Sequence, residues 1–114
     1  MAHTQISLIQ KIYDLYKDVY QAVKLFPKGD KHNLGNEIKN YSLQLLELLF
    51  KAERAKKDWK LPHLENADTK LSLLKLLFRL AYDLKIIDQR KSINLQEQLQ
   101  EIGRMLGGWI KSVK

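Results

Sequence analysis

The chain has 114 residues, a length typical of one domain, so we expect residues 1–114 to fold as a single unit. It contains no cysteine, which excludes disulfides, iron–sulfur clusters, thiolate zinc sites and a cysteine nucleophile. Twenty lysines and arginines against thirteen aspartates and glutamates give a formal net charge of +7, which favours an anionic partner such as nucleic acid or an acidic protein face.

No segment of the sequence predicts export or membrane insertion. The first ten residues lack the basic stretch followed by an apolar run that is typical of a secretory signal. The unbroken apolar runs are far shorter than the roughly 20 residues that span a bilayer. We therefore expect a cytoplasmic protein with no membrane partner.

The first of four expected helices covers residues 5–26. Steps of 100° place its large apolar side chains in one half of the helical wheel. Pro27 ends the helix, because proline disfavours helical geometry at the residue before it. Tyr13, Tyr16 and Tyr20 line one edge at helical spacing, a pattern that favours residues at the core boundary or at an interface over stacking platforms.

The second expected helix covers residues 33–58, with the carboxamide of Asn33 as its N-cap. Its core stripe has ordinary helical spacing. A second apolar strip lies about a third of a turn away on the wheel. This strip consists of Leu43, Leu46 and Phe50.

Pro62 and its neighbours are expected to form the next connection, followed by a third helix over residues 66–87. The apolar residues of this helix spread over roughly 220° of the wheel at 3.6 residues per turn. A helix in a monomeric bundle needs a stripe only somewhat over 100° wide. The surplus includes Leu73, Leu76 and Leu80.

The fourth expected helix covers residues 94–113. Asn94 followed by Glu97 forms a capping box at its start, with Ser92 as the rival N-cap. Four helices of about 20 residues joined by short connections predict an all-α fold, an antiparallel up-down-up-down four-helix bundle.

Two glycines, Gly103 and Gly107, lie four residues apart beside the core stripe of the last helix. Each costs a helix roughly 0.5–1 kcal/mol relative to alanine, so we expect a neighbour to need the space. Tight packing within the bundle is the first interpretation. A close contact between subunits and the approach of a ligand are the alternatives.

The surplus apolar surface on the second and third helices indicates self-association. Small soluble monomers rarely expose large apolar patches, so we expect the extra strips to meet another copy of the chain. A monomer that holds both helices deep in its bundle is one alternative, and a helix lying on a membrane surface is another. The expected interface residues are Leu43, Leu46, Phe50, Leu73, Leu76 and Leu80.

No pattern in the sequence predicts catalysis, a cofactor or a metal site. Helical metal-binding motifs and glycine-rich phosphate cradles are absent. No nucleophile stands with a base and an oxyanion site. His32 and His63 fall in expected connections, where solvated histidines are common. We therefore do not expect an enzyme.

Basic residues are the informative polar feature. Lys75 and Arg79 lie one turn apart on the narrow polar stripe of an otherwise apolar helix. A plain solvated stripe is the first interpretation, and a functional pair along a groove or channel formed by the assembly is the alternative. A second cluster ends the second helix, where cations also complement the helix dipole. Trp59 within it is expected to pack under the connection rather than to stack on a base. The other candidates for contact with nucleic acid or a protein partner are Arg54, Lys57, Arg104 and Lys111.

Three stretches resemble a known family. Residues 25–28 and 34–38 resemble the junction of the first two helices in the four-helix-bundle family first noted in ribosomal-RNA intervening sequences. Residues 101–110, EIGRMLGGWI, resemble the last helix of the Avd branch of that family, the accessory variability proteins of diversity-generating retroelements. Residues 71–80 are similar to the third helix of that branch, because two basic residues stand four apart among large apolar ones.

This resemblance implies a ring-like homopentamer of four-helix bundles. The pentamer would bind the retroelement reverse transcriptase and its template RNA or DNA, in support of mutagenic complementary-DNA synthesis. Lys75 and Arg79 match the basic pair that faces these partners, with a lysine first where the family has arginine. Lysine lacks the planar fork that binds a phosphate or carboxylate in a bidentate way. The alternative functions are a general nucleic-acid-binding bundle of the intervening-sequence type without an enzyme partner, and a purely structural self-assembling bundle.

Overall fold

The computed structural model describes residues 3–114, with side chains from residue 7 onward. It contains four long helices and one short helix: α1 (His3–Lys24), α2 (Lys28–His32), α3 (Leu34–Arg54), α4 (Lys57–Asp83) and α5 (Gln89–Val113). No strand occurs in this part of the chain, so the prediction of an all-α fold is confirmed for it.

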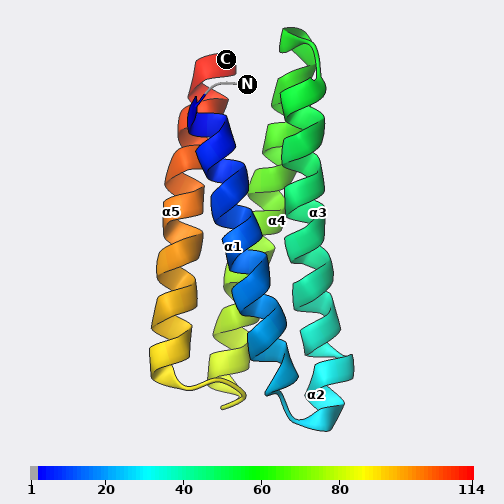
Figure 1. The fold of residues 1–114 in the computed structure, drawn as a ribbon, viewed down its shortest axis with the longest axis vertical. Helices are drawn as coiled ribbons and strands as arrows, with labels where there is room; N and C mark the ends of the chain where they lie inside the picture. The colour runs from blue at the N-terminus through cyan, green and yellow to red at the C-terminus, as the bar shows by residue number, and fades with distance from the viewer. Residues whose placement is uncertain (1–2) are drawn as a thin grey trace.

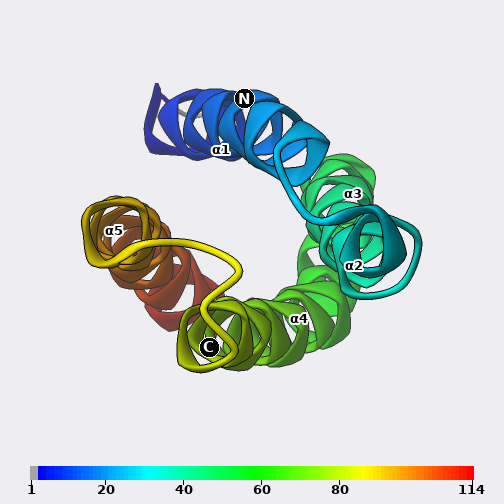
Figure 2. The same cartoon turned by 90° about the horizontal axis from the view of Figure 1, so that it is seen from below.

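The four long helices form an antiparallel bundle (Figure 1). Each long helix runs opposite to the one before it, and each packs against its successor along the chain. Helix α5 closes the arrangement by packing against α1, so that α1 lies diagonally across from α4 when the bundle is seen end on (Figure 2). The bundle measures 44 × 23 × 19 Å.

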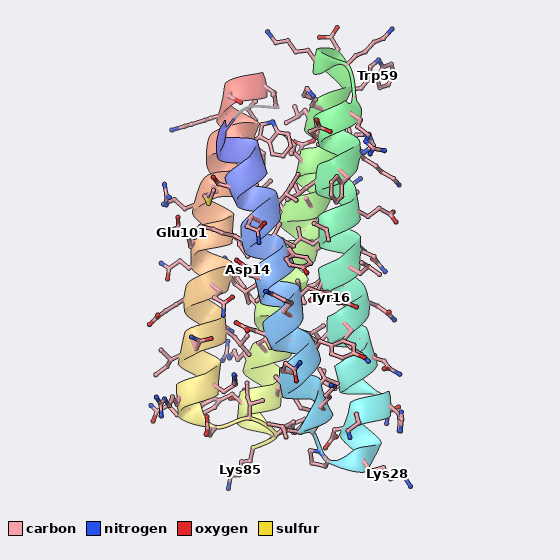
Figure 3. All side chains as sticks on the ribbon, viewed as in Figure 1. Asp14, Tyr16, Lys28, Trp59, Lys85 and Glu101 are labelled. Carbon is pink, nitrogen blue, oxygen red and sulfur yellow. The ribbon has the colours of Figure 1, made fainter. Side chains whose placement is uncertain are left out.

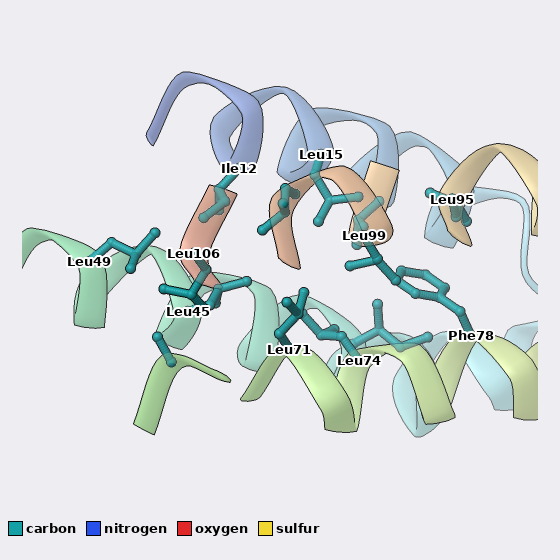
Figure 4. Packing of buried hydrophobic residues seen from close by; sticks show 14 of the residues in the cluster. Ile12, Leu15, Leu45, Leu49, Leu71, Leu74, Phe78, Leu95, Leu99 and Leu106 are labelled. Atoms are coloured by element: carbon teal, nitrogen blue, oxygen red, sulfur yellow. The ribbon is translucent and has the colours of Figure 1, made fainter. Parts of the chain in front are cut away.

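The core lies along the bundle axis and is built from one stripe of each helix. Figure 4 shows side chains from all four long helices meeting there, among them Leu15 of α1, Leu45 of α3, Phe78 of α4 and Leu99 of α5. These four residues are at most 1% exposed. Burying each such side chain contributes about 1.5–3 kcal/mol to stability. Among the side chains described from residue 7 onward, Ser42 is the buried polar one, and its hydroxyl donates to the Ile38 carbonyl at 2.7 Å.

The junction of α1 and α3 differs from the sequence prediction of a first helix over residues 5–26. Helix α1 starts at His3 and ends at Lys24, and Phe26 is buried beyond its end. The short helix α2 was not predicted. Asn33 does precede α3, but its side chain makes no N-cap hydrogen bond and its Nδ2 donates to the Gly29 carbonyl at 3.0 Å. The predicted position of this cap is therefore right and its predicted mechanism wrong.

Close packing fixes the same junction at Gly35. A Cβ atom at this position would lie 2.6 Å from Val23 Cγ1 and 3.3 Å from the Asp30 carbonyl oxygen. Only a residue without a side chain allows α3 to approach α1 and α2 so closely.

The connection predicted around Pro62 is wrong. Helix α3 ends at Arg54 rather than at residue 58, and α4 begins at Lys57, so Pro62 lies inside α4 as its sixth residue. Pro62 has no N–H to donate to the Asp58 carbonyl, so the helix lacks one hydrogen bond near its start. Leu64 and Ala67, which follow the proline, are buried and belong to the apolar stripe of α4. Their packing against the core stabilises the helix at this point.

The connection between α4 and α5 also begins and ends earlier than predicted. Helix α4 ends at Asp83 rather than at residue 87, because Lys85 adopts a left-handed conformation with φ of 61° and the Ile86 N–H bonds back to the Ala81 carbonyl at 2.8 Å. Helix α5 starts at Gln89, not at residue 94.

The N-cap of α5 is Asp88, whose Oδ1 accepts from the backbone N–H of Lys91 at 2.8 Å. The predicted capping box at Asn94 and the rival cap at Ser92 both lie inside the helix and are wrong. A carboxylate is a strong cap because it also complements the positive end of the helix dipole.

Substitution of Gly35 tests the close approach. We expect G35A to lower the free energy of unfolding, because overpacking costs about 1–3 kcal/mol, which outweighs the gain of up to about 1 kcal/mol in helix propensity. The control is G29A, where no atom lies within 4 Å of the added Cβ. Chemical denaturation of both variants measures the effect, and a G35A protein as stable as G29A would contradict it.

Candidate functional site

Lys75 and Arg79 lie in a groove between α4 and α5 on the surface of the bundle. The groove has a volume of about 440 Å³ and is open to solvent. Gln96 of α5 lines the groove and donates from Nε2 to the Lys75 carbonyl at 3.1 Å, a hydrogen bond that joins the two helices. The groove is lined by Ser72, Lys75, Leu76, Arg79, Tyr82, Ser92 and Gln96. It is a surface of mixed hydroxyl, amide, cationic and apolar groups within one subunit.

The glycine at position 103 lies beside Lys75 and has its tightest neighbour in Leu71. A Cβ atom on Gly103 would lie 3.6 Å from Lys75 Nζ and 3.3 Å from Leu71 Cδ2. The lysine stem therefore lies across α5 with its ammonium group beside the bare backbone, and Lys75 is half-buried. This placement holds the charge at the edge of the groove.

Arg79 has a different environment, one turn along α4. Its guanidinium is exposed and its Nε lies 3.9 Å from Asp83 Oδ2. An exposed pair at this distance contributes little to stability. The planar face and remaining N–H groups of Arg79 stay available to a partner.

The other predicted cations do not join this groove. Arg54 and Lys57 are exposed at the corner between α3 and α4, and Lys111 is exposed in the last turn of α5. Arg104 on α5 is held by Glu101 through two hydrogen bonds, one of them from Nε to Oε2 at 3.1 Å. The structure thus separates the predicted basic residues into three places.

The apolar strip predicted on the second helix lies on a face shared by α1 and α3. Leu43 and Phe50 are 52% and 40% exposed, and Leu46 is half-buried. Tyr13 and Tyr20 of α1 are also exposed on the side of α1 that faces α3. We call this surface the α1–α3 face.

Lysines cover part of the aromatic surface of the α1–α3 face. Tyr20 lies between Lys24 and Lys39, whose ammonium groups are 5.1 and 5.5 Å from the ring centre. Lys17 lies 5.2 Å from the ring of Tyr13. Such contacts stabilise cations near exposed tyrosines by about 0.5–1 kcal/mol. Of the three tyrosines singled out in the sequence, Tyr16 is half-buried at the core boundary, whereas Tyr13 and Tyr20 are exposed.

The apolar surplus of the third predicted helix lies on the outer side of α4. Leu76 and Leu80 are 59% and 42% exposed, and Leu73 is half-buried. Leu84 extends this strip beyond the end of the helix and is also exposed. The α4 strip lies on another side of the bundle from the α1–α3 face, because α4 is diagonally across from α1.

Two interpretations of single residues need correction. Gly107 and Gly108 have no atom within 4 Å of an added Cβ, so tight packing within the bundle accounts for Gly103 and not for them. Trp59, expected to pack under a connection, is 67% exposed.

Within residues 3–114, no group of three metal-binding side chains comes together. None of the helices there carries a stretch apolar enough to cross a bilayer.

The sequence matches a family model described as bAvd-like over residues 6–113. The chain belongs to the bAvd-like family. Comparison with curated protein sequences gives no match. The family match spans all four long helices, so it covers both the α4–α5 groove and the two apolar surfaces. It agrees with the resemblance seen in three separate stretches of the sequence.

Sequence reasoning missed the α5 side of the groove. Ser92 and Gln96 are four residues apart, so both point to the same side of α5, and Gly103 continues that line about two turns later. The signal was present as a row of small and polar residues beside the core stripe. Which helix faces that row depends on the packing of α5 against α4, and the sequence pattern does not contain it.

The pair of Glu101 and Arg104 predicts a measurable titration. The hydrogen bonds from Arg104 lower the pKa of Glu101 below its ordinary value. The pair therefore stabilises the fold at pH values above the ordinary glutamate pKa, and this contribution is lost as the pH falls through the lowered value. We expect R104Q to return the Glu101 midpoint towards that of a free glutamate, measured by carbon NMR of the carboxyl group. An unchanged midpoint would contradict the pairing.

Proposed function

We propose that this protein is a non-catalytic accessory subunit of a diversity-generating retroelement. In this role it binds the element's reverse transcriptase and template RNA or DNA and supports mutagenic complementary-DNA synthesis. The observation that carries the proposal is the bAvd-like match over residues 6–113. The net charge of +7 and the groove that presents Lys75 and Arg79 support it.

The α4–α5 groove is suited to a partner with negative charge and hydrogen-bonding groups. Lys75 supplies a point charge at a fixed place, and Arg79 supplies a fork for a phosphate or carboxylate. Ser72 and Gln96 add neutral donors and acceptors beside them. A protein loop with acidic residues and a nucleic-acid backbone both have this chemistry, and the reverse transcriptase and its template would supply them.

A ring of identical subunits is the assembly that we propose. The α1–α3 face and the α4 strip both leave large apolar side chains in water, which a small soluble monomer rarely does. The two surfaces have different residues and lie on different sides of the bundle. If one binds the other on the next copy, the contact is head-to-tail, and repeated head-to-tail contacts close into a ring when the rotation between copies allows it. The number of five subunits comes from the resemblance to Avd proteins.

Charge reversal in the groove tests the proposed function. We expect K75E/R79E to lose capture of the reverse transcriptase of the proposed retroelement, because like charges would then face the partner's acidic groups. The matched control is K28E/R90E, which reverses one exposed lysine and one exposed arginine near the end of the bundle where α2 lies. Co-purification of the untagged enzyme with each tagged variant gives the readout.

Three results of this experiment have distinct meanings. Loss in K75E/R79E with retention in the control supports the groove. Equal capture by all variants removes the groove from the proposal. If the unmodified protein captures no enzyme at low salt but binds nucleic acid, the general nucleic-acid-binding bundle is the correct function, and the accessory role is wrong.

Light scattering tests the proposed assembly. We expect the unmodified protein to have a mass several times its subunit mass of 13.4 kDa. L76E/L80E should reduce this mass to that of one subunit, because carboxylates cannot be buried without a partner. The control Q21E/Q100E adds the same charge at exposed positions on α1 and α5. A single-subunit mass for the unmodified protein at high concentration would overturn the ring.

A further inference from the structure

The corner between α3 and α4 forms an exposed, cationic tip at one end of the bundle. We define the bundle tip as Arg54, Lys56, Lys57 and Trp59. Figure 3 shows Trp59 at this end, far from Lys28 and Lys85 at the other. Trp59 is 67% exposed, and all three cations are exposed. Among the described side chains, none of these cations takes part in an ion pair.

The fold uses one lysine of this segment and leaves the others free. Lys60 Nζ donates to the carbonyls of Ala52 and Glu53 at 2.8 and 3.0 Å, and so satisfies the end of α3. Lys56 and Lys57 lie at the first turn of α4, where the helix dipole is already positive. The dipole of α4 therefore does not stabilise these two charges, whereas Arg54 lies in the last turn of α3 and complements that helix end.

The chemistry of the tip is that of a site for unpaired nucleotides. An indole ring offers a flat face on which any base can stack, at about 1–3 kcal/mol per base. Cations beside the ring reach the phosphates on either side of that base. Asp58 is the one carboxylate between residues 54 and 60, so the segment keeps a net positive charge.

We propose that the bundle tip binds an unpaired nucleotide of single-stranded nucleic acid. Trp59 stacks on the base, while Arg54, Lys56 and Lys57 bind the neighbouring phosphates. This inference rests on the nucleic-acid part of the proposed function and adds a second site, at the end of the bundle and apart from the α4–α5 groove. In a duplex the bases pair and stack with each other, so no base face is free for the indole. The tip therefore selects single strands.

A membrane surface is a weaker fit to the same residues. Peripheral binding to lipid needs a broad apolar face beside the cations. Trp59 is the one large exposed apolar side chain of the tip. The cations of the tip complement the negative charge of a phosphate backbone, and the one indole ring has room to stack on one base.

Binding of a short single-stranded RNA and of its fully paired duplex, measured by fluorescence anisotropy, tests this assignment. We expect W59A to weaken single-strand binding by about 5-fold to 150-fold, the range given by the loss of one stacked base, and to leave duplex binding unchanged. W59F keeps a stacking ring and should recover most of the affinity. The control is L25A, which removes an 85% exposed apolar side chain outside the bundle tip.

Salt dependence and tryptophan emission separate stacking from charge. W59A should leave the salt slope of binding unchanged, whereas K56A/K57A should reduce it by roughly 0.7 for each phosphate that the variant no longer binds. RNA should quench the emission of the unmodified protein and not that of W59F, because Trp109, the other tryptophan, is buried. Equal single-strand affinity of W59A and the unmodified protein would overturn the proposal.

The outcomes also separate this site from the proposed function. Capture of the reverse transcriptase should be the same for W59A and the unmodified protein, because the enzyme is assigned to the groove. If the unmodified protein binds no RNA at low salt, the tip site and the nucleic-acid part of the proposed function both fail. Binding to anionic vesicles that W59A loses, without loss of RNA binding, would assign the tip to a lipid surface instead.

Discussion

Helices α3 and α4 carry more large apolar side chains than the core of one bundle buries. A four-helix bundle buries one stripe of each helix, and here that stripe is filled by residues such as Leu45 and Leu74, both 0% exposed. Leu43 and Leu76 lie beyond it and are 52% and 59% exposed, and no rotation of either helix would bury them without exposing the core residues. One chain therefore fills its own core but leaves large apolar side chains exposed on its surface. This exposed apolar surface is the physical reason to propose that copies of the chain associate.

The polar surface is organised around the same geometry. Since the outer side of α4 is apolar, Lys75 and Arg79 lie on the side that faces α5, where they line the groove. The other candidate cations lie at the end of the bundle near residue 57 and along the outside of α5. In a ring, symmetry places the same groove and the same tip on every subunit at equal height. One long partner that contacted several subunits of such a ring would bind more tightly than each single contact allows, because each bound site raises the effective concentration of the partner at the next.

Most of the fold follows from residue patterns, and the errors have local causes. Helical periodicity predicted four helices and their buried faces, because a stripe with 3.6-residue spacing has few other solutions in a small protein. The boundaries failed where two signals competed. Pro62 favours a break in the helix although the apolar stripe continues through Leu64, and Asn94 has the spacing of a cap although Asp88 precedes it with a stronger acceptor. The exposure of Trp59 was missed because an indole packs under a loop only if the loop is long enough to cover it, and the observed connection is two residues long.

Composition and spacing along each helix were enough to establish the helical class, the surplus of apolar surface and the positive charge, and the resemblance of three stretches indicated the family. Which helix packs against which followed only from the folded bundle. This packing brought Gln96 and Gly103 beside Lys75, placed the second apolar strip next to the tyrosines of α1, and carried Trp59 to an uncovered corner. These relations join residues from different helices or depend on the length of a turn. Spacing within one helix contains no information about the helix across from it, so only the packed bundle could supply them.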